Sequence, residues 1–346
     1  MLKQKMAEIS QDDLSVFVDT YRANGRNVSA TSRELGISRQ SVKRRIDEAG
    51  SRGILGDDEI HDALSLSADE YISAKARKQR EYQEKKKKGR WDKPVYVELP
   101  QKPFCIIMFG DPHLDDPSCD FEQFEDAWLR MDVTKGIYGA CIGDWFNNWL
   151  RVLGHLWKEG GNPDDAWVLF EHLMEERGGA LIAACSGNHD DWTHAPYDPI
   201  DLLMKRHGVR YRKGAIRLLL NAGGASPISI ALRHKWRGHS MYSPAHGIRK
   251  AAAEGMEDDI MVGGHIHQDE LRMYAQPRSG KISHICQISS FKKFDLFADV
   301  HGFKSHVISP VWFLVVDPER DSTDPDKVKV FWDGDAAECY LAAIRK

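Results

Sequence analysis

The chain has 346 residues, 42% of them hydrophobic, and a formal net charge of -4. This length allows two domains with a sizeable core, and the charge argues against a surface uniformly coated by nucleic acid, although it leaves room for a local basic patch. No apolar stretch approaches the ~20 residues needed to cross a bilayer, and the N-terminus lacks the apolar segment of a signal peptide. The six cysteines show no C-x-x-C spacing. We therefore expect reduced thiols in a soluble, cytoplasmic protein without a membrane partner.

The first fifty residues predict a small helical domain. Apolar residues at helical spacing predict helices over 12–24, 28–35 and 39–49. Gly25 and Gly36 end the first two helices, and Ser38 is a suitable N-cap for the third. The segment from residue 29 to 46 resembles the helix-turn-helix of transposase and resolvase-like DNA-binding modules.

The outer face of the third predicted helix is basic. Its candidate DNA contacts are Arg39, Gln40, Lys43 and Arg44. Such side chains donate hydrogen bonds to base edges and phosphates in a major groove. The alternative is a helical domain used for protein contacts, in which these side chains are only solvated.

A charged segment separates this predicted domain from the rest of the chain. We expect a helix-turn-helix domain over residues 1–50, a basic helical linker over 51–95, and a catalytic domain over 96–346. The linker is interpreted as a solvated spacer or as an arm that follows DNA phosphates, and one segment can serve both roles.

From residue 104 onward, apolar runs of strand length alternate with helical stretches, which is typical of a layered α/β domain. The predicted strands that precede polar motifs cover residues 104–109, 138–142, 180–184, 228–233 and 260–262. The polar residues that follow them in order are Asp111 and His113, Asp144, Asn188 and His189, His234, and His265 and His267. Ligands of α/β sheets bind at the carboxyl ends of strands, so these side chains are expected to meet.

The number and chemistry of these side chains point to two metal ions. Two aspartates, several histidines and one amide are too many ligands for a single ion. Mixed oxygen and imidazole ligation suits Mn, Fe, Zn or Ni better than Mg or Ca, and we expect two divalent ions, with Mn favoured. Two such ions are suited to hydrolysis at a phosphoryl centre.

The motifs Asp111-x-His113, Gly143-Asp144-x-x-Asn147, Gly187-Asn-His-Asp190, His234 and Gly264-His-x-His267 together resemble the motif set of the calcineurin-like metallophosphoesterases. The resemblance implies an α/β fold of two packed mixed β-sheets flanked by helices. The residues that would hold one metal are Asp111, His113 and His267. The residues that would hold the other are Asn188, His234 and His265. Asp144 would bridge the two metals.

The resemblance also implies roles beside the metals. His189 would protonate the leaving oxygen or stabilise the transition-state phosphate, oriented by Asp190. Asn147 would support the metal ligands. His239 lies five residues after His234 and is an alternative metal ligand, although His234 is favoured because it directly ends its strand.

Two further segments are candidates for substrate contact. Asn148 and Arg151 follow the bridging aspartate closely enough to reach a phosphate near the metals. Lys292 and Lys293 follow the metal-binding segment and would either cradle a diester backbone or be solvated loop charges. The C-terminal part predicts strands over 307–317 and 328–332 and a helix over 336–344.

These observations predict a two-metal phosphodiesterase that acts on DNA, targeted by its helix-turn-helix. The resembling family includes DNA-repair nucleases, and its combination with an N-terminal helix-turn-helix is similar to proteins of phage and prophage genomes. The alternative is a phosphatase or phosphodiesterase for protein, nucleotide or small-molecule substrates. A third reading is a DNA-binding regulator with a passive phosphoesterase scaffold, which the full ligand set disfavours. The partner expected is DNA, and a homo-oligomer is compatible with the sequence.

Overall fold

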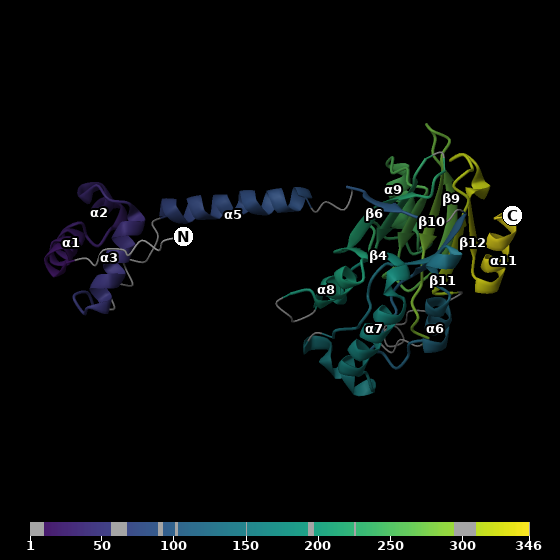
Figure 1. Cartoon of the computed structure of the whole chain (residues 1–346), viewed down its shortest axis with the longest axis horizontal. Helices are drawn as coiled ribbons and strands as arrows, with labels where there is room; N and C mark the ends of the chain where they lie inside the picture. The colour runs from purple at the N-terminus through teal and green to yellow at the C-terminus, as the bar shows by residue number, and fades with distance from the viewer. Residues whose placement is uncertain are drawn as a thin grey trace. The chain divides into compact units, whose positions relative to one another are not determined.

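The structure, a computed structural model, describes residues 10–56, 68–88, 93–100, 103–149, 151–192, 197–224, 226–293 and 309–345. The chain separates into two compact units, Met1–Lys88 and Gly89–Lys346 (Figure 1). Within the described ranges, no helix is both long and apolar enough to span a membrane.

The first unit contains α1 (Gln11–Ala23), α2 (Val28–Leu35), α3 (Arg39–Ser51) and α5 (Ala68–Lys88). The three short helices expected from the sequence are therefore present. Asn27 and Ser38 cap α2 and α3 by accepting backbone N–H groups, and Gly36 ends α2 in the left-handed region with φ of 62°. The helices enclose a small core whose fully buried members include Phe17, Val42 and Ile46.

The second unit is built on two six-stranded mixed sheets. In spatial order, the first sheet contains β1 (Val95–Glu98), β6 (Ala215–Asn221), β7 (Ile228–Arg233), β8 (Ile260–Gly263), β10 (Ile282–Gln287) and β9 (Glu270–Ala275). The second sheet contains β12 (Val328–Phe331), β11 (Val311–Val316), β2 (Phe104–Phe109), β3 (Ile137–Cys141), β4 (Leu181–Cys185) and β5 (Arg210–Arg212). Strands β2 to β5 run parallel, as do β7, β8 and β10, so the carboxyl ends of neighbouring strands share an edge.

The two sheets pack face to face, and helices cover their outer faces. Alternate side chains of β2 point to opposite sides: Ile106 and Met108 join the core between the sheets, while Ile107 and Phe109 join the core beneath the helices. All six residues of β2 are buried because both faces of its sheet are covered. This arrangement confirms the predicted α/β sandwich of two mixed sheets.

The covering helices fall into two groups. Those packed on the second sheet are α6 (Phe121–Leu129), α7 (Pro163–Arg177), α8 (Pro199–Arg206) and α11 (Gly334–Ile344). Helix α9 (His246–Ala253) packs on the first sheet, and Figure 1 shows it away from α6 and α7. The short 3-10 helices are Val133–Lys135, Arg151–Glu159, Gly178–Ala180, Asp190–Trp192 and Pro325–Lys327.

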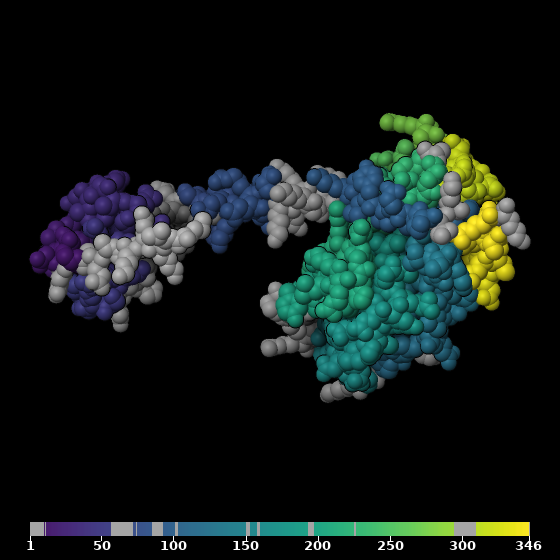
Figure 2. Space-filling model, viewed as in Figure 1, coloured from purple at the N-terminus to yellow at the C-terminus, as the bar shows by residue number. Residues whose placement is uncertain are grey.

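The C-terminal elements complete the second sheet, as expected. The predicted strand over 307–317 is β11, and residues 307 and 308 lie outside the described ranges. Figure 2 shows the C-terminal residues, in yellow, on one flank of the unit. There the rings of Phe331 on β12 and Tyr340 on α11 lie 5.3 Å apart between centroids.

Candidate metal centre

The turns after five strands bring the predicted ligands to one edge of the sandwich. Of the seven non-glycine residues with positive φ in the described part of the chain, all but Arg26 lie in these turns. They are Asp111, His113, Asp144, Asn148, His265 and His267. A non-glycine residue seldom adopts this conformation, and such strain concentrates at functional sites because the surrounding structure must enforce it.

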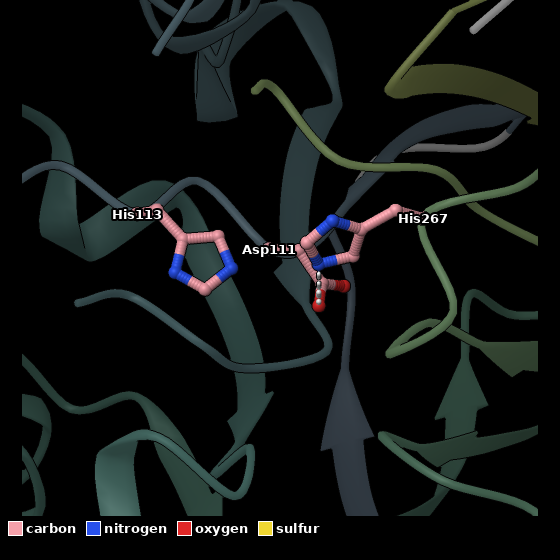
Figure 3. Close-up of side chains that lie close together, drawn as sticks. All are labelled: Asp111, His113 and His267. Atoms are coloured by element: carbon pink, nitrogen blue, oxygen red, sulfur yellow. Dashed lines mark ion pairs between the residues drawn. The ribbon is translucent and has the colours of Figure 1, made fainter. Parts of the chain in front are cut away.

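Asp111, His113 and His267 form the first cluster (Figure 3), with one ligand atom of each within 4.8 Å of the others. Asp111 and His113 follow β2, and His267 follows β8. The Nε2 atom of His267 lies 3.4 Å from Oδ1 of Asp111. Asp111 and His113 are buried, while His267 is half-buried, so the cluster has one side toward solvent.

The first cluster leaves buried polar atoms without hydrogen-bond partners. Oδ1 of Asp111 and both ring nitrogens of His113 are such atoms within the described structure. Burying polar atoms without a partner is costly. One carboxylate and two imidazoles are also the donors that suit a transition metal. The residues of this cluster therefore fit a divalent ion.

Asp144, His234 and His265 form the second cluster by the same distance criterion. Nε2 of His234 lies 3.1 Å from Oδ2 of Asp144 and 3.1 Å from Oδ1 of Asn188. Because a carbonyl oxygen only accepts, Nδ1 of His234 must donate its proton to the Ile142 carbonyl at 2.9 Å. This bond directs Nε2 toward the cluster, as outer partners of metal-binding histidines commonly do.

The geometry distinguishes the two histidines that the sequence left as alternatives. His234 is buried and belongs to the second cluster, whereas His239 is exposed on the loop after β7. Burial disfavours the charged form of His234, but the carboxylates of Asp144 and Asp111 outweigh it and raise its pKa to about 9. Burial lowers the pKa of His265 to about 4.

A hydrogen bond joins the two clusters. The backbone N–H of His265, in the second cluster, donates to Oδ2 of Asp111 in the first at 3.2 Å. Glycines make this approach feasible: a Cβ atom on Gly264 would lie 2.5 Å from the same oxygen, and one on Gly187 would collide with the carboxylate of Asp144.

His189 lies beside both clusters, but Asp190 does not orient it as predicted. Nδ1 of His189 lies 2.6 Å from the carbonyl oxygen of Asn147. The carboxylate of Asp190 accepts the backbone N–H groups of Asp144, Trp145 and Gly187 at 2.8–2.9 Å. The predicted role of Asp190 is therefore wrong: this carboxylate ties two ligand-bearing turns together. Burial, followed by repulsion from Asp144, raises its pKa to about 8.

The amides after β3 have supporting contacts. Asn147 is buried and donates its side-chain amide to Asp116 at 2.9 Å. Asn148 donates its side-chain amide to the carbonyl oxygen of His189 at 3.1 Å. The side chain of Arg151 lies outside the described residues.

The two candidate lysines differ from each other. Lys292 is 7% exposed and pairs with Asp116, its Nζ 2.8 Å from the carboxylate. Lys293 is exposed and pairs with Asp120 at 3.0 Å. Neither of the two sequence interpretations, a phosphate cradle or a solvated charge, describes the buried ion pair of Lys292.

Sequence reasoning missed several residues around the clusters. Asp115 accepts the backbone N–H of Asn147 at 2.7 Å, and the ring of Trp192 lies 4.2 Å from that of His189 between centroids. The paired acids Asp115 and Asp116, directly after the first ligand motif, were the available signal. No local pattern singles out Trp192.

No family model matches the chain, and no curated protein matches it. Solved structures similar to it include Vacuolar Protein Sorting 29 from Cryptosporidium parvum, at 14% identity and a TM-score of 0.32, covering 67% of this chain and 97% of that one. A conserved uncharacterized protein from Streptococcus pneumoniae, described as a predicted phosphoesterase, has 15% identity, a TM-score of 0.32, and coverage of 67% and 99%. The calcineurin-like phosphoesterase YfkN from Bacillus subtilis has 12% identity, a TM-score of 0.30, and coverage of 71% and 100%. These similarities are too low to assign an activity to this chain.

Proposed function

We propose that the second unit is a two-metal-dependent phosphoesterase of the calcineurin-like class, and that its substrate is a phosphodiester of DNA. The observation that carries this proposal is the pair of Asp/His clusters, which are joined by the hydrogen bond from the His265 N–H to Asp111. Oδ1 of Asp111 and both ring nitrogens of His113 add to it, because they are buried ligand atoms without a hydrogen bond in the described structure.

The proposed role of each residue is the one that the motif resemblance implies. The first metal would be held by Asp111, His113 and His267. The second metal would be held by Asn188, His234 and His265. Asp144 would contribute to both sites. Divalent ions such as Mn would lower the pKa of a water molecule and neutralise charge on the phosphoryl oxygens.

His189 is the candidate proton donor to the leaving oxygen. Because Nδ1 must donate to the Asn147 carbonyl at 2.6 Å, Nε2 is the nitrogen left for a substrate, and it carries a proton for the leaving oxygen when the ring is an imidazolium. The rings of Trp149 and Trp192 lie 5.2 Å and 4.2 Å from the His189 ring between centroids. These neighbours restrict both the orientation of the imidazole and its access to water.

The proposed DNA substrate is supported by the first unit. Val42 and Ile46 on the apolar face of α3 are buried in the core of the first unit. Arg39, Gln40 and Arg44 on the same helix are exposed. These side chains lie on the second helix of a helix-turn-helix-like pair, where major-groove contacts are made in such modules. The exposed basic residues of α5 would add sequence-independent affinity for phosphates.

A substrate panel tests the proposal. Protein supplied with Mn²⁺ is assayed on single- and double-stranded DNA, bis-p-nitrophenyl phosphate and p-nitrophenyl phosphate, with Asp144→Ala as the control. We expect cleavage of DNA and of the small diester, and loss of both in the control. Cleavage of the monoester alone would contradict the nuclease proposal, and full activity of Asp144→Ala would contradict the site.

A further inference from the structure

Lys292 is one of three polar side chains next to the metal centre that all contact one another, and the three form a triangle. Its Nζ lies 2.8 Å from Oδ2 of Asp116 and 3.3 Å from Oδ1 of Asn147. The third side of the triangle is the bond from the Asn147 amide to the same Asp116 oxygen, at 2.9 Å. These residues come from the segments that follow β10, β2 and β3, so the triangle joins three loops.

Two lines of contact run from Lys292 to His189. The first passes through Asn147, whose side chain binds Lys292 and whose carbonyl oxygen accepts the Nδ1 proton of His189. The second passes through Trp149. The ammonium group of Lys292 lies 5.2 Å from the centroid of that ring, within cation–π range, and the ring lies 5.2 Å from His189.

Stability alone does not explain a charge at this position. Moving an ammonium group out of water is costly, and a buried ion pair commonly adds no more stability than apolar residues of similar volume. The backbone of Lys292 is also fixed toward the site, because its N–H donates to Ser290 Oγ, which in turn donates to the carbonyl oxygen of Asp111. The placement instead suits a side chain that fixes the positions of Asp116, Asn147 and Trp149, which it contacts.

We propose that Lys292 is a positioning residue that fixes the His189 imidazole through Asn147 and Trp149. This inference rests on the proposed function, because it concerns the proton donor of that reaction. Its geometric part is independent of activity, since it states that the hydrogen bond from His189 Nδ1 depends on Lys292.

The first test measures that hydrogen bond in the full chain prepared without metal. Nitrogen-15 spectra of the histidine rings are recorded for wild type and Lys292→Met, and His189→Ala identifies the His189 signals. We expect the wild-type ring to be a single Nδ1–H tautomer, and the Lys292→Met ring to average between tautomers. Unchanged His189 signals in Lys292→Met would overturn the proposal.

The second test is a double-mutant cycle on bis-p-nitrophenyl phosphate. Misplacement of a catalytic group by ~1 Å costs on the order of 100-fold in rate, so we expect Lys292→Met to lower kcat by roughly 10–100-fold with KM and metal content unchanged. In a His189→Ala background, the same substitution should have little further effect. If the two kcat losses instead multiply in the double variant, the two residues act independently, and the proposal that Lys292 acts through His189 is overturned.

Two further variants keep the result interpretable. Lys205→Met removes an exposed lysine that pairs with Asp201 on α8, and it should change neither the spectra nor kcat. Asp116→Asn keeps the shape of the triangle but removes the carboxylate that pairs with Lys292. If Lys292→Met does not fold, both tests are run on Asp116→Asn with the same expected results. If wild type fails to hydrolyse the diester, the proposed function is wrong, while the spectra still decide whether Lys292 positions His189.

Discussion

His265 and His267 are separated by one residue, yet they belong to different ligand clusters. His265 joins Asp144 and His234, and His267 joins Asp111 and His113. Strand β8 ends at Gly263, and both histidines have positive φ, 73° and 52°. The turn therefore separates two imidazoles that would leave an extended strand on the same side.

This separation predicts how metal is lost on substitution. His265→Ala and His267→Ala should each retain about one of two bound ions, because each removes a ligand from one cluster. His234→Ala/His265→Ala should still retain one ion, whereas His265→Ala/His267→Ala should retain none. Metal analysis of purified protein measures this, with the exposed His172→Ala as a control. Loss of both ions from either single variant would contradict separate sites.

Gly187 is predicted to be indispensable because of its close contact with Asp144. A Cβ at this position would collide with the carboxylate and backbone nitrogen of Asp144, so Gly187→Ala must displace a ligand of the second cluster. We expect loss of at least one bound metal and of diester hydrolysis. Gly179→Ala, where the added Cβ has open space, is the matched control. Normal metal content in Gly187→Ala would show that the turn is not as constrained as described.

The exposed face of α3 is predicted to bind DNA. Arg44→Ala in the full chain should weaken DNA affinity by roughly tenfold, the usual scale for one recognition contact, and leave hydrolysis of bis-p-nitrophenyl phosphate unchanged. Fluorescence anisotropy over a range of salt concentrations measures the effect. Lys329→Ala, which removes a partly exposed lysine beside Asp326, controls for net charge. Equal affinity of Arg44→Ala and wild type would argue against α3 as the DNA contact.

A buried ion pair away from the metal centre predicts a pH-dependent stability. Burial opposes ionisation of Asp259, but Lys281 and the hydrogen bonds from Ser229 outweigh it and hold the pKa of Asp259 below its usual value. A lowered folded-state pKa stabilises the fold above the unfolded value of about 3.9, and this contribution disappears as the pH falls through the folded-state pKa. Asp259→Asn should therefore cost about 3 kcal/mol at neutral pH, and less in acid.

Tryptophan fluorescence in denaturant measures this cost, because all ten tryptophans lie in residues 89–346. The exposed Asp326→Asn, which loses a surface pair with Lys329, should cost less than about 1 kcal/mol. An Asp259→Asn effect of equal size at pH 7 and at about pH 3 would contradict the proposed role of ionisation.

Much of the fold and the ligand set could be predicted because both depend on local patterns. The apolar runs before Asp111, Asp144 and His234 are buried strands, and parallel strands present their carboxyl ends at one edge. Strands such as β5 and β9 were not predicted, because they are short or partly exposed and lack a long apolar run.

The contacts that surround the ligands could not be predicted in the same way. Asp190 directly follows His189, which suggested a side-chain pair, but its carboxylate instead satisfies the backbone N–H groups of turns. The burial of Lys292 depends on Asp116 and Asn147, which come from distant parts of the sequence. Such pairings follow from how the loops meet in three dimensions, and residue spacing does not encode them.

The dependence of diester hydrolysis on bound metal tests the central claim most directly. Metal-free protein is titrated with Mn²⁺ while occupancy and hydrolysis of bis-p-nitrophenyl phosphate are measured on the same samples. The two clusters predict negligible hydrolysis without metal, and full activity only as occupancy approaches two ions per chain. Full activity at one ion per chain, or activity that survives complete removal of metal, would contradict a two-metal phosphoesterase.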